Sequence, residues 1–148
     1  MSRKAIESLR SATFVWKLTV PSIPDGIEKL LGAVVGNPAV LDLNHLREAV
    51  FERQKMNPSV LPSGVAFPHA RTDAVRALVI AVATLAAPLP ASAVSVQMMF
   101  LIGVPKSAAK EYLELMSLLT RNLRTASAVE QLCRFTEKDE FLNALAAT

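Results

Sequence analysis

Two continuous apolar runs constrain the fold of this 148-residue chain more than any other feature. Leu78 to Leu85 is rich in valine, isoleucine and leucine, and Val94 to Val104 ends directly before Pro105. Runs without alternating polar residues are typical of central strands that are covered on both faces. The longest apolar stretch, Ala77 to Leu89, is too short and too interrupted to span a bilayer.

The flanking segments carry the signals of the elements that would cover these strands. Ser22 and Asp42 can each cap a helix, and Ser107 can cap a third, longer one. The expected elements are a strand over 13–20, helices to about 35 and from 42 to about 55, a short strand over 65–67, the two apolar strands, and helices over 107–123, 126–135 and 138–147. We therefore expect an α/β sandwich in which helices cover both faces of a mixed β-sheet.

Length and composition favour a single folded domain. Hydrophobic residues make up 51% of the chain, which excludes a largely disordered protein. Residues 1–13 are interpreted as a polar N-terminal leader or a frayed helix, and residues 14–148 as the domain. The polar N-terminus lacks the apolar core of a secretory signal, so we expect a cytoplasmic protein. The one cysteine, Cys133, is expected to pack in a helix.

The charge pattern and the scarcity of metal ligands narrow the classes of function. The net charge of +3 is scattered apart from Arg121 and Arg124, so no nucleic acid partner is expected. A DNA-associated regulator, suggested only by the pI of about 9.3, is the weakest alternative. Two histidines and one cysteine cannot form a closed metal site, and no glycine-rich phosphate loop is present. We therefore expect neither a metal nor a cofactor.

The candidate chemistry lies in one run, Ser63-Gly64-Val65-Ala66-Phe67-Pro68-His69-Ala70-Arg71. A neutral imidazole is a good nucleophile toward phosphorus near pH 7. The planar fork of an arginine binds two phosphoryl oxygens at once. If residues 69–71 are extended, the side chains of His69 and Arg71 share one face. The run is thus suited to a covalent phosphoryl acceptor, although a lone histidine after a proline is also common as an ordinary loop residue.

Further side chains could meet His69 from other elements. Arg53 continues the apolar line of Leu43, Leu46 and Val50, which is costly for a cation unless it has a partner. Ser59 lies in the following loop and could donate a hydrogen bond to the ring or to a phosphoryl oxygen. A core-edge arginine and a turn serine are the ordinary alternatives. The second histidine, His45, lies off the apolar line and is expected at the surface.

Gly64 to Arg71 closely resembles the active-site motif of the enzyme IIA domains of the fructose/mannitol class, which belong to the bacterial phosphoenolpyruvate-dependent sugar phosphotransferase system. The class includes nitrogen-regulatory relatives. Arg53, the apolar strands and the leucine-rich segment from Tyr112 to Leu119 extend the resemblance to about residues 14–148. It implies that HPr or a nitrogen-branch counterpart phosphorylates His69, which then passes the group to a IIB domain or signals to a regulatory target. The class would meet the membrane only through a transporter.

The resemblance also suggests a role for each site residue. Arg71 and Arg53 would balance phosphoryl charge, and Ser59 and Tyr112 would orient the ring or an oxygen. Ser59-Val60-Leu61-Pro62 stands where the family commonly has Thr-Gly-Ile-Gly, and Tyr112 replaces a usual second histidine. These departures leave open a second hypothesis, a catalytically weak or inactive IIA-like module that binds a regulatory protein. The apolar content also permits a homodimer.

Overall fold

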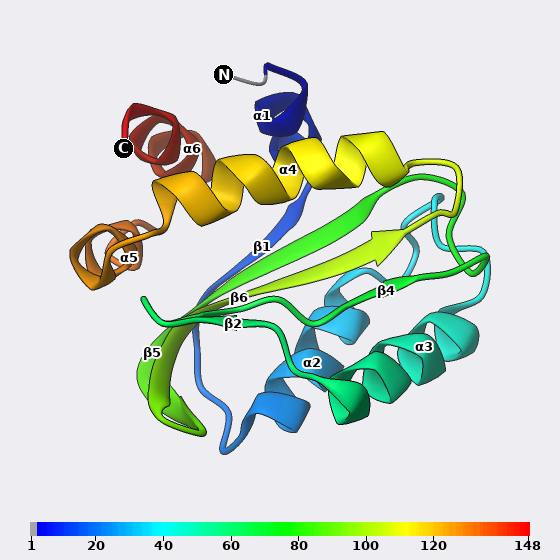
Figure 1. Ribbon diagram of the computed structural model, residues 1–148, viewed down its shortest axis with the longest axis horizontal. Helices are drawn as coiled ribbons and strands as arrows, with labels where there is room; N and C mark the ends of the chain where they lie inside the picture. The colour runs from blue at the N-terminus through cyan, green and yellow to red at the C-terminus, as the bar shows by residue number, and fades with distance from the viewer. Residues whose placement is uncertain (1–2) are drawn as a thin grey trace.

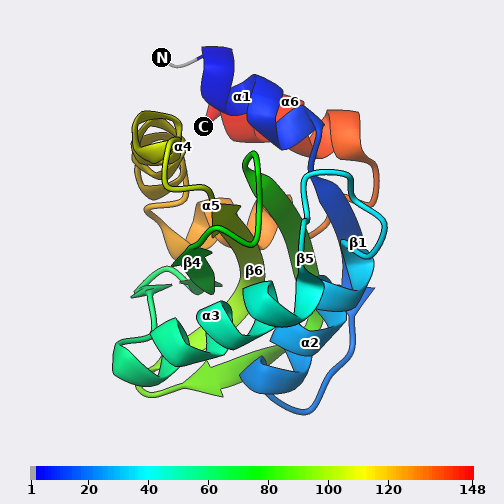
Figure 2. The same ribbon diagram turned by 90° about the vertical axis from the view of Figure 1, so that its right-hand side faces the viewer.

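In the computed structural model, which describes residues 3–148, the strands form one mixed sheet with helices on both of its faces (Figures 1 and 2). The strands are β1 (Thr13–Leu18), β2 (Val60–Leu61), β3 (Val65–Ala66), β4 (His69–Arg71), β5 (Val79–Ala91) and β6 (Val94–Val104). The helices are α1 (Arg3–Arg10), α2 (Ile23–Ala33), α3 (Leu43–Met56), α4 (Ala109–Asn122), α5 (Ala126–Leu132) and α6 (Lys138–Ala147). The predicted fold class is confirmed.

The two apolar runs form the antiparallel pair β5 and β6 at the centre of the sheet, between β1 and β3. Their side chains alternate between two buried clusters, because successive residues of a strand point to opposite faces. One cluster holds Ile80, Val82, Phe100 and Ile102, and the other holds Val79, Ala81, Met99 and Leu101. β5 continues beyond the predicted end at Leu85 to Ala91, since its last residues pair with the start of β6.

Helices α2 and α3 cover one face of the sheet, while α1, α4, α5 and α6 lie on the other (Figure 1). The description of residues 1–13 as a polar leader needs correction, because Ala5 and Leu9 of α1 are buried in the core beside α4. Met1 and Ser2 of that segment lie outside the described residues. Along residues 3–148, no helix combines the length and the apolar composition needed to cross a bilayer.

The helix starts follow the predicted caps in two of three cases. The side chains of Ser22 and Asp42 accept hydrogen bonds from backbone N–H groups in the first turns of α2 and α3, at 3.3 and 3.0 Å. The prediction that Ser107 caps α4 is wrong, because Ala108 occupies the N-cap without a side-chain hydrogen bond. A turn closed from Ala108 N–H to the carbonyl of Pro105 delays the start of this helix.

The short strands β3 and β4 carry the candidate site to the centre of the sheet. Both pair in parallel with β6, one after the other, so that His69 lies opposite Ile102. Gly64 precedes β3 with a φ of 105°, and a Cβ there would lie 2.8 Å from the carbonyl oxygen of Ser95. A side chain is therefore excluded at this position, which fixes the entry of the motif into the sheet.

Candidate functional site

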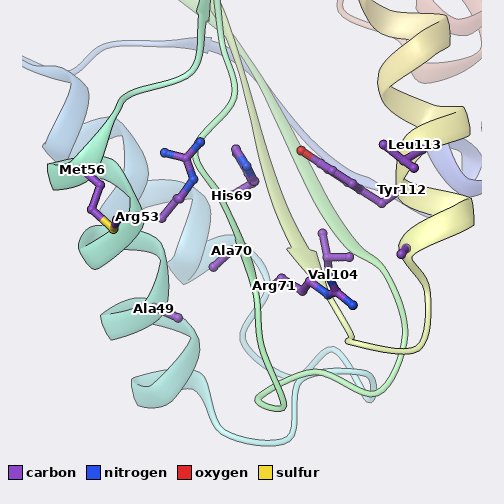
Figure 3. Close-up of a pocket in the computed structure, with 10 residues that line it drawn as sticks. Ala49, Arg53, Met56, His69, Ala70, Arg71, Val104, Tyr112 and Leu113 are labelled. Carbon is purple, nitrogen blue, oxygen red and sulfur yellow. The ribbon is translucent and has the colours of Figure 1, made fainter.

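A cavity of about 520 Å³ lies between α3 and α4, beside β4 (Figure 3). Four of the five predicted site residues line this His69 cavity, and Ser59 does not. Its lining is Ala49, Arg53 and Met56 of α3, His69, Ala70 and Arg71 of β4, Val104 of β6, and Ala109, Tyr112 and Leu113 of α4. The cavity thus collects residues from four elements far apart in the sequence.

The half-buried ring of His69 has one nitrogen in a hydrogen bond, and within residues 3–148 the other nitrogen has no hydrogen-bond partner. Its Nδ1 lies 2.7 Å from the carbonyl oxygen of Phe67, two residues earlier in the chain. A carbonyl oxygen can only accept a hydrogen bond, so Nδ1 carries the proton and donates it. In the neutral ring Nε2 then holds the lone pair. Nε2 is therefore the nitrogen that can attack an electrophile.

The surroundings of His69 favour the neutral, nucleophilic form of the ring. Burial is the main reason why the pKa of His69 lies below its ordinary value of 6.5. The hydrogen bond to Phe67 raises the pKa, and the charge of Arg53 lowers it. At pH 7 the ring is therefore predominantly uncharged, as a nucleophile must be.

Arg53 reaches the cavity from the last turn of α3, where the apolar line of the helix places it. Leu46 and Val50 on the same line are buried, and Arg53 is half-buried at its end. Figure 3 shows the guanidinium beside the ring of His69. Its Nη1 donates to the carbonyl oxygen of Asn57, so the side chain is fixed by a neutral group and keeps an uncompensated positive charge.

Arg71 lies two residues after His69 on β4, so the condition that residues 69–71 are extended is met. Its Nη2 donates to the carbonyl oxygen of Lys106 at 3.2 Å, in the turn before α4. None of the residues lining the cavity is acidic, so neither arginine meets a carboxylate there. The start of α4 at Ala109 adds the positive end of a helix dipole to the same place. The cavity is consequently suited to a negatively charged group.

Tyr112 lines the His69 cavity, whereas Ser59 does not. The ring of Tyr112 stacks beside that of His69, with centroids 5.7 Å apart and an interplanar angle of 26°. Burial raises the pKa of the Tyr112 hydroxyl, so it stays protonated and can donate a hydrogen bond. Ser59 is half-buried, and its carbonyl oxygen accepts from Phe67 N–H at 2.8 Å. Its predicted side-chain role stays a prediction.

The sequence reasoning missed the apolar residues of the cavity mouth. Met56 and Leu113 are 83% and 64% exposed, and they approach the cavity from α3 and α4. Their helical spacing from Arg53 and Ala109 is the signal that could have identified them. Exposed large apolar side chains around a cavity are typical of a protein interaction site. The carbonyl groups that hold the ring and the arginines are backbone atoms and leave no such signal.

Two other reactive residues lie away from the cavity. His45 is exposed on α3, as predicted. Cys133 is buried in the core, as predicted, and burial raises the pKa of its thiol to about 11. Within the part of the chain that the structure describes, no three histidine, cysteine or carboxylate side chains gather in an arrangement that could hold a metal ion.

Solved structures with the same fold define the class of protein. The nitrogen regulatory protein IIA-Ntr of Neisseria meningitidis aligns with a TM-score of 0.79 and 25% identity, over 89% of this chain and 92% of its own. The complex of enzyme IIAMTL with phosphorylated enzyme IIBMTL from Escherichia coli gives a TM-score of 0.76 at 17% identity, over 100% of this chain and 98% of that chain. The fold is that of the enzyme IIA domains.

The sequence comparison is more specific. The family model described as phosphoenolpyruvate-dependent sugar phosphotransferase system, EIIA 2, matches residues 7–148, and the chain belongs to this family. The 2-O-alpha-mannosyl-D-glycerate-specific EIIABC component of Escherichia coli is 33% identical over 103 residues, which are 66% of this chain and 16% of that protein. The fructose-specific EIIA component of Haloferax volcanii is 29% identical over 130 residues, 85% of this chain and 84% of that protein.

Proposed function

We propose that this chain is a phosphohistidine carrier in which Nε2 of His69 accepts a phosphoryl group from HPr or a nitrogen-branch counterpart. The observation that carries the proposal is the hydrogen bond from Nδ1 to Phe67, which leaves Nε2 as the free nitrogen. In the transfer a P–N bond forms at Nε2 while the P–N bond of the donor breaks, and the donor nitrogen recovers its lone pair. No proton needs to leave His69, since Nδ1 keeps its own.

Arg53 and Arg71 would carry most of the stabilisation. Phosphoryl transfer depends mainly on positioning and on cationic support for the oxygens. Both guanidinium groups are already fixed by backbone carbonyls, Asn57 and Lys106, so little reorganisation is needed when the charge arrives. Tyr112 would hold the ring by stacking and donate to one oxygen. The onward acceptor is a IIB domain or a regulatory target, which docks over the same mouth.

The direct test is labelling with phosphoenolpyruvate, enzyme I and HPr or its nitrogen-branch counterpart. We expect acid-labile phosphate on the wild-type chain and on His45→Ala, and none on His69→Ala. The exposed His45 is a suitable control, because its substitution disturbs no core contact. Equal labelling of the two variants would overturn the proposal.

The exposed Met56 and Leu113 favour a second candidate, a binding module with little or no turnover. A protein can dock on such a mouth whether or not a phosphoryl group moves. This alternative predicts a stable complex with a target protein and no labelling with any cognate donor. It also predicts that His69→Ala leaves the affinity for the target unchanged.

A further inference from the structure

A second cavity, of about 460 Å³, lies beneath the tip of the hairpin that joins β5 to β6. The hairpin curls toward the start of α2 (Figure 1). We call this space the hairpin cavity, and its lining is Ile23, Gln54, Asn57, Pro58, Val60, Ala66, Pro90, Ala91, Ser92 and Val94. It shares no lining residue with the His69 cavity.

The lining of the hairpin cavity has the chemistry of a site for a small neutral molecule. None of its residues is charged, and most of the wall is apolar. Gln54, Asn57 and Ser92 supply two amides and one hydroxyl. None of these three side chains hydrogen-bonds to another group within residues 3–148. Apolar walls with a few unpaired polar groups are the usual pattern of ligand pockets. Ser92 has a φ of 57°, as the two-residue turn between the paired residues Ala91 and Val94 requires.

Hydrogen bonds link the loop that borders this cavity to Arg53 and to His69. Asn57 lines the hairpin cavity, while its carbonyl oxygen holds the guanidinium of Arg53. Ser59, in the same loop, accepts from Phe67 N–H, and the carbonyl of Phe67 accepts from Nδ1 of His69. Asn57, Pro58 and Val60 of this loop therefore line the hairpin cavity, while the carbonyl groups of Asn57 and Ser59 connect the same loop to Arg53 and, through Phe67, to His69.

We propose that the hairpin cavity binds a small uncharged molecule with an apolar body and an amide or hydroxyl group, and that its occupancy alters the reactivity of His69. A ligand that contacts Asn57 and Pro58 would move the loop and with it the carbonyl groups that orient Arg53 and the imidazole. The regulatory consequence rests on the function proposed above. The proposed binding of the molecule and its effect on the imidazole of His69 do not depend on that function.

Benzamide is a suitable probe, because it places a neutral amide on an apolar ring, and benzoate is its charged isostere. In a ¹H–¹⁵N NMR titration to about 10 mM, we expect benzamide to shift the amides of Asn57, Val60 and Ser92 saturably, with a millimolar dissociation constant. Benzoate should not produce these shifts. Absent or unsaturable shifts, or equal shifts with benzoate, would overturn the site.

Matched variants separate the site from general effects. Ala91→Leu fills the cavity and should abolish the shifts, whereas Ala93→Leu, exposed in the same turn and outside the lining, should keep them. Gln54→Leu removes one amide from the wall and replaces Ala91→Leu as the test if that variant does not fold. It should weaken benzamide binding severalfold. Binding that survives the cavity-blocking substitution would contradict the proposal.

The effect of an occupied hairpin cavity on His69 is measured from the pKa of its imidazole ring. With benzamide at saturation, we expect the pKa of His69, followed through its ring resonances, to change by about 0.3 pH units or more. The resonances of the exposed His45 serve as an internal control for a general effect of the probe. No change at His69 despite proven binding would overturn the coupling, while labelling with phosphoenolpyruvate separately decides the carrier function.

Discussion

The two cavities have similar volumes, about 520 and 460 Å³, but very different chemistry. The last turn of α3 separates them and distributes its side chains between them. Arg53 and Met56 face the His69 cavity, while Gln54 and Asn57 face the hairpin cavity. Volume alone therefore says little about function here. What distinguishes the His69 cavity is an imidazole beside two guanidinium groups that, within residues 3–148, pair with no carboxylate.

The difference also shows how uncompensated charge is maintained in a folded protein. Arg47 at the surface pairs with Glu28, at 2.5 Å, and its charge is thereby neutralised. Arg53 and Arg71 are held by the carbonyl groups of Asn57 and Lys106 instead. A carbonyl fixes the guanidinium without cancelling its charge, which leaves the full attraction available for an incoming dianion.

The largest expected effect comes from removing the positive charge of Arg53, which the His69 cavity has and the hairpin cavity lacks. Arg53→Gln should slow single-turnover phosphorylation of His69 about 100-fold, because a preorganised donor to the developing charge is lost. Arg53→Lys keeps the charge without the fork and should lose about tenfold. Rapid-quench measurement of acid-labile phosphate gives both rates. Arg124→Gln, exposed at the other end of α4, is the control and should match wild type.

The centre of the fold could be predicted because apolar runs leave few alternatives for β5 and β6. The edge strands β2 and β4 have only two and three residues, and their conformation is set by pairing with β3 and β6. No local sequence pattern predicts β2, and an extended conformation of residues 69–71 was considered only as a condition for His69 and Arg71 to share a face. A helix was one of the two interpretations of residues 1–13, but the packing of α1 in the core was missed, since only a few apolar residues anchor it.

In the candidate site, too, one part could be predicted from the sequence and another could not. His69, Arg71, Arg53 and Tyr112 were identified from residue type, spacing and resemblance, and all four line one cavity. The groups that hold them are the backbone carbonyls of Phe67, Asn57 and Lys106. Every residue has a carbonyl, so the sequence cannot indicate which ones will point inward. Their positions follow only from the folded chain.

The next largest effect is expected when the exposed apolar side chains at the mouth of the His69 cavity are replaced. Leu113→Ser and Met56→Ser should each weaken the complex with the phosphoryl donor about tenfold, mainly through faster dissociation, since exposed apolar anchors are lost. Surface plasmon resonance with immobilised HPr or its counterpart gives the affinities. Val35→Ser is the matched control, because Val35 is 66% exposed but lies outside the cavity lining. Similar losses at all three positions would mean that the mouth is not the interface.

The pH profile tests whether burial protects the nucleophile. Because the pKa of His69 is lowered, mainly by burial, the phosphorylation rate should begin to decline at a lower pH than for an ordinary histidine, and well below the lowered pKa it should fall about tenfold per pH unit. The neutral ring is favoured in the folded state, so its contribution to stability is present above the unfolded pKa and is lost as the pH falls through the folded value. In Arg53→Gln the decline should begin at higher pH, since the charge that lowers the pKa is gone.

The smallest effect concerns Tyr112, which is the clearest departure from the family pattern. Tyr112→Phe keeps the stacked ring at 5.7 Å from His69 and removes only the hydroxyl, so a loss of about threefold in rate is expected for one neutral hydrogen bond. Tyr112→Ala also removes the stack and should cost more, with a change in the His69 ring resonances. If Phe and Ala behave alike, the hydroxyl is the important group; if Phe equals wild type, the stack is. A fall for Tyr112→Phe as large as that of Arg53→Gln would contradict the assignment of the main stabilisation to the arginine.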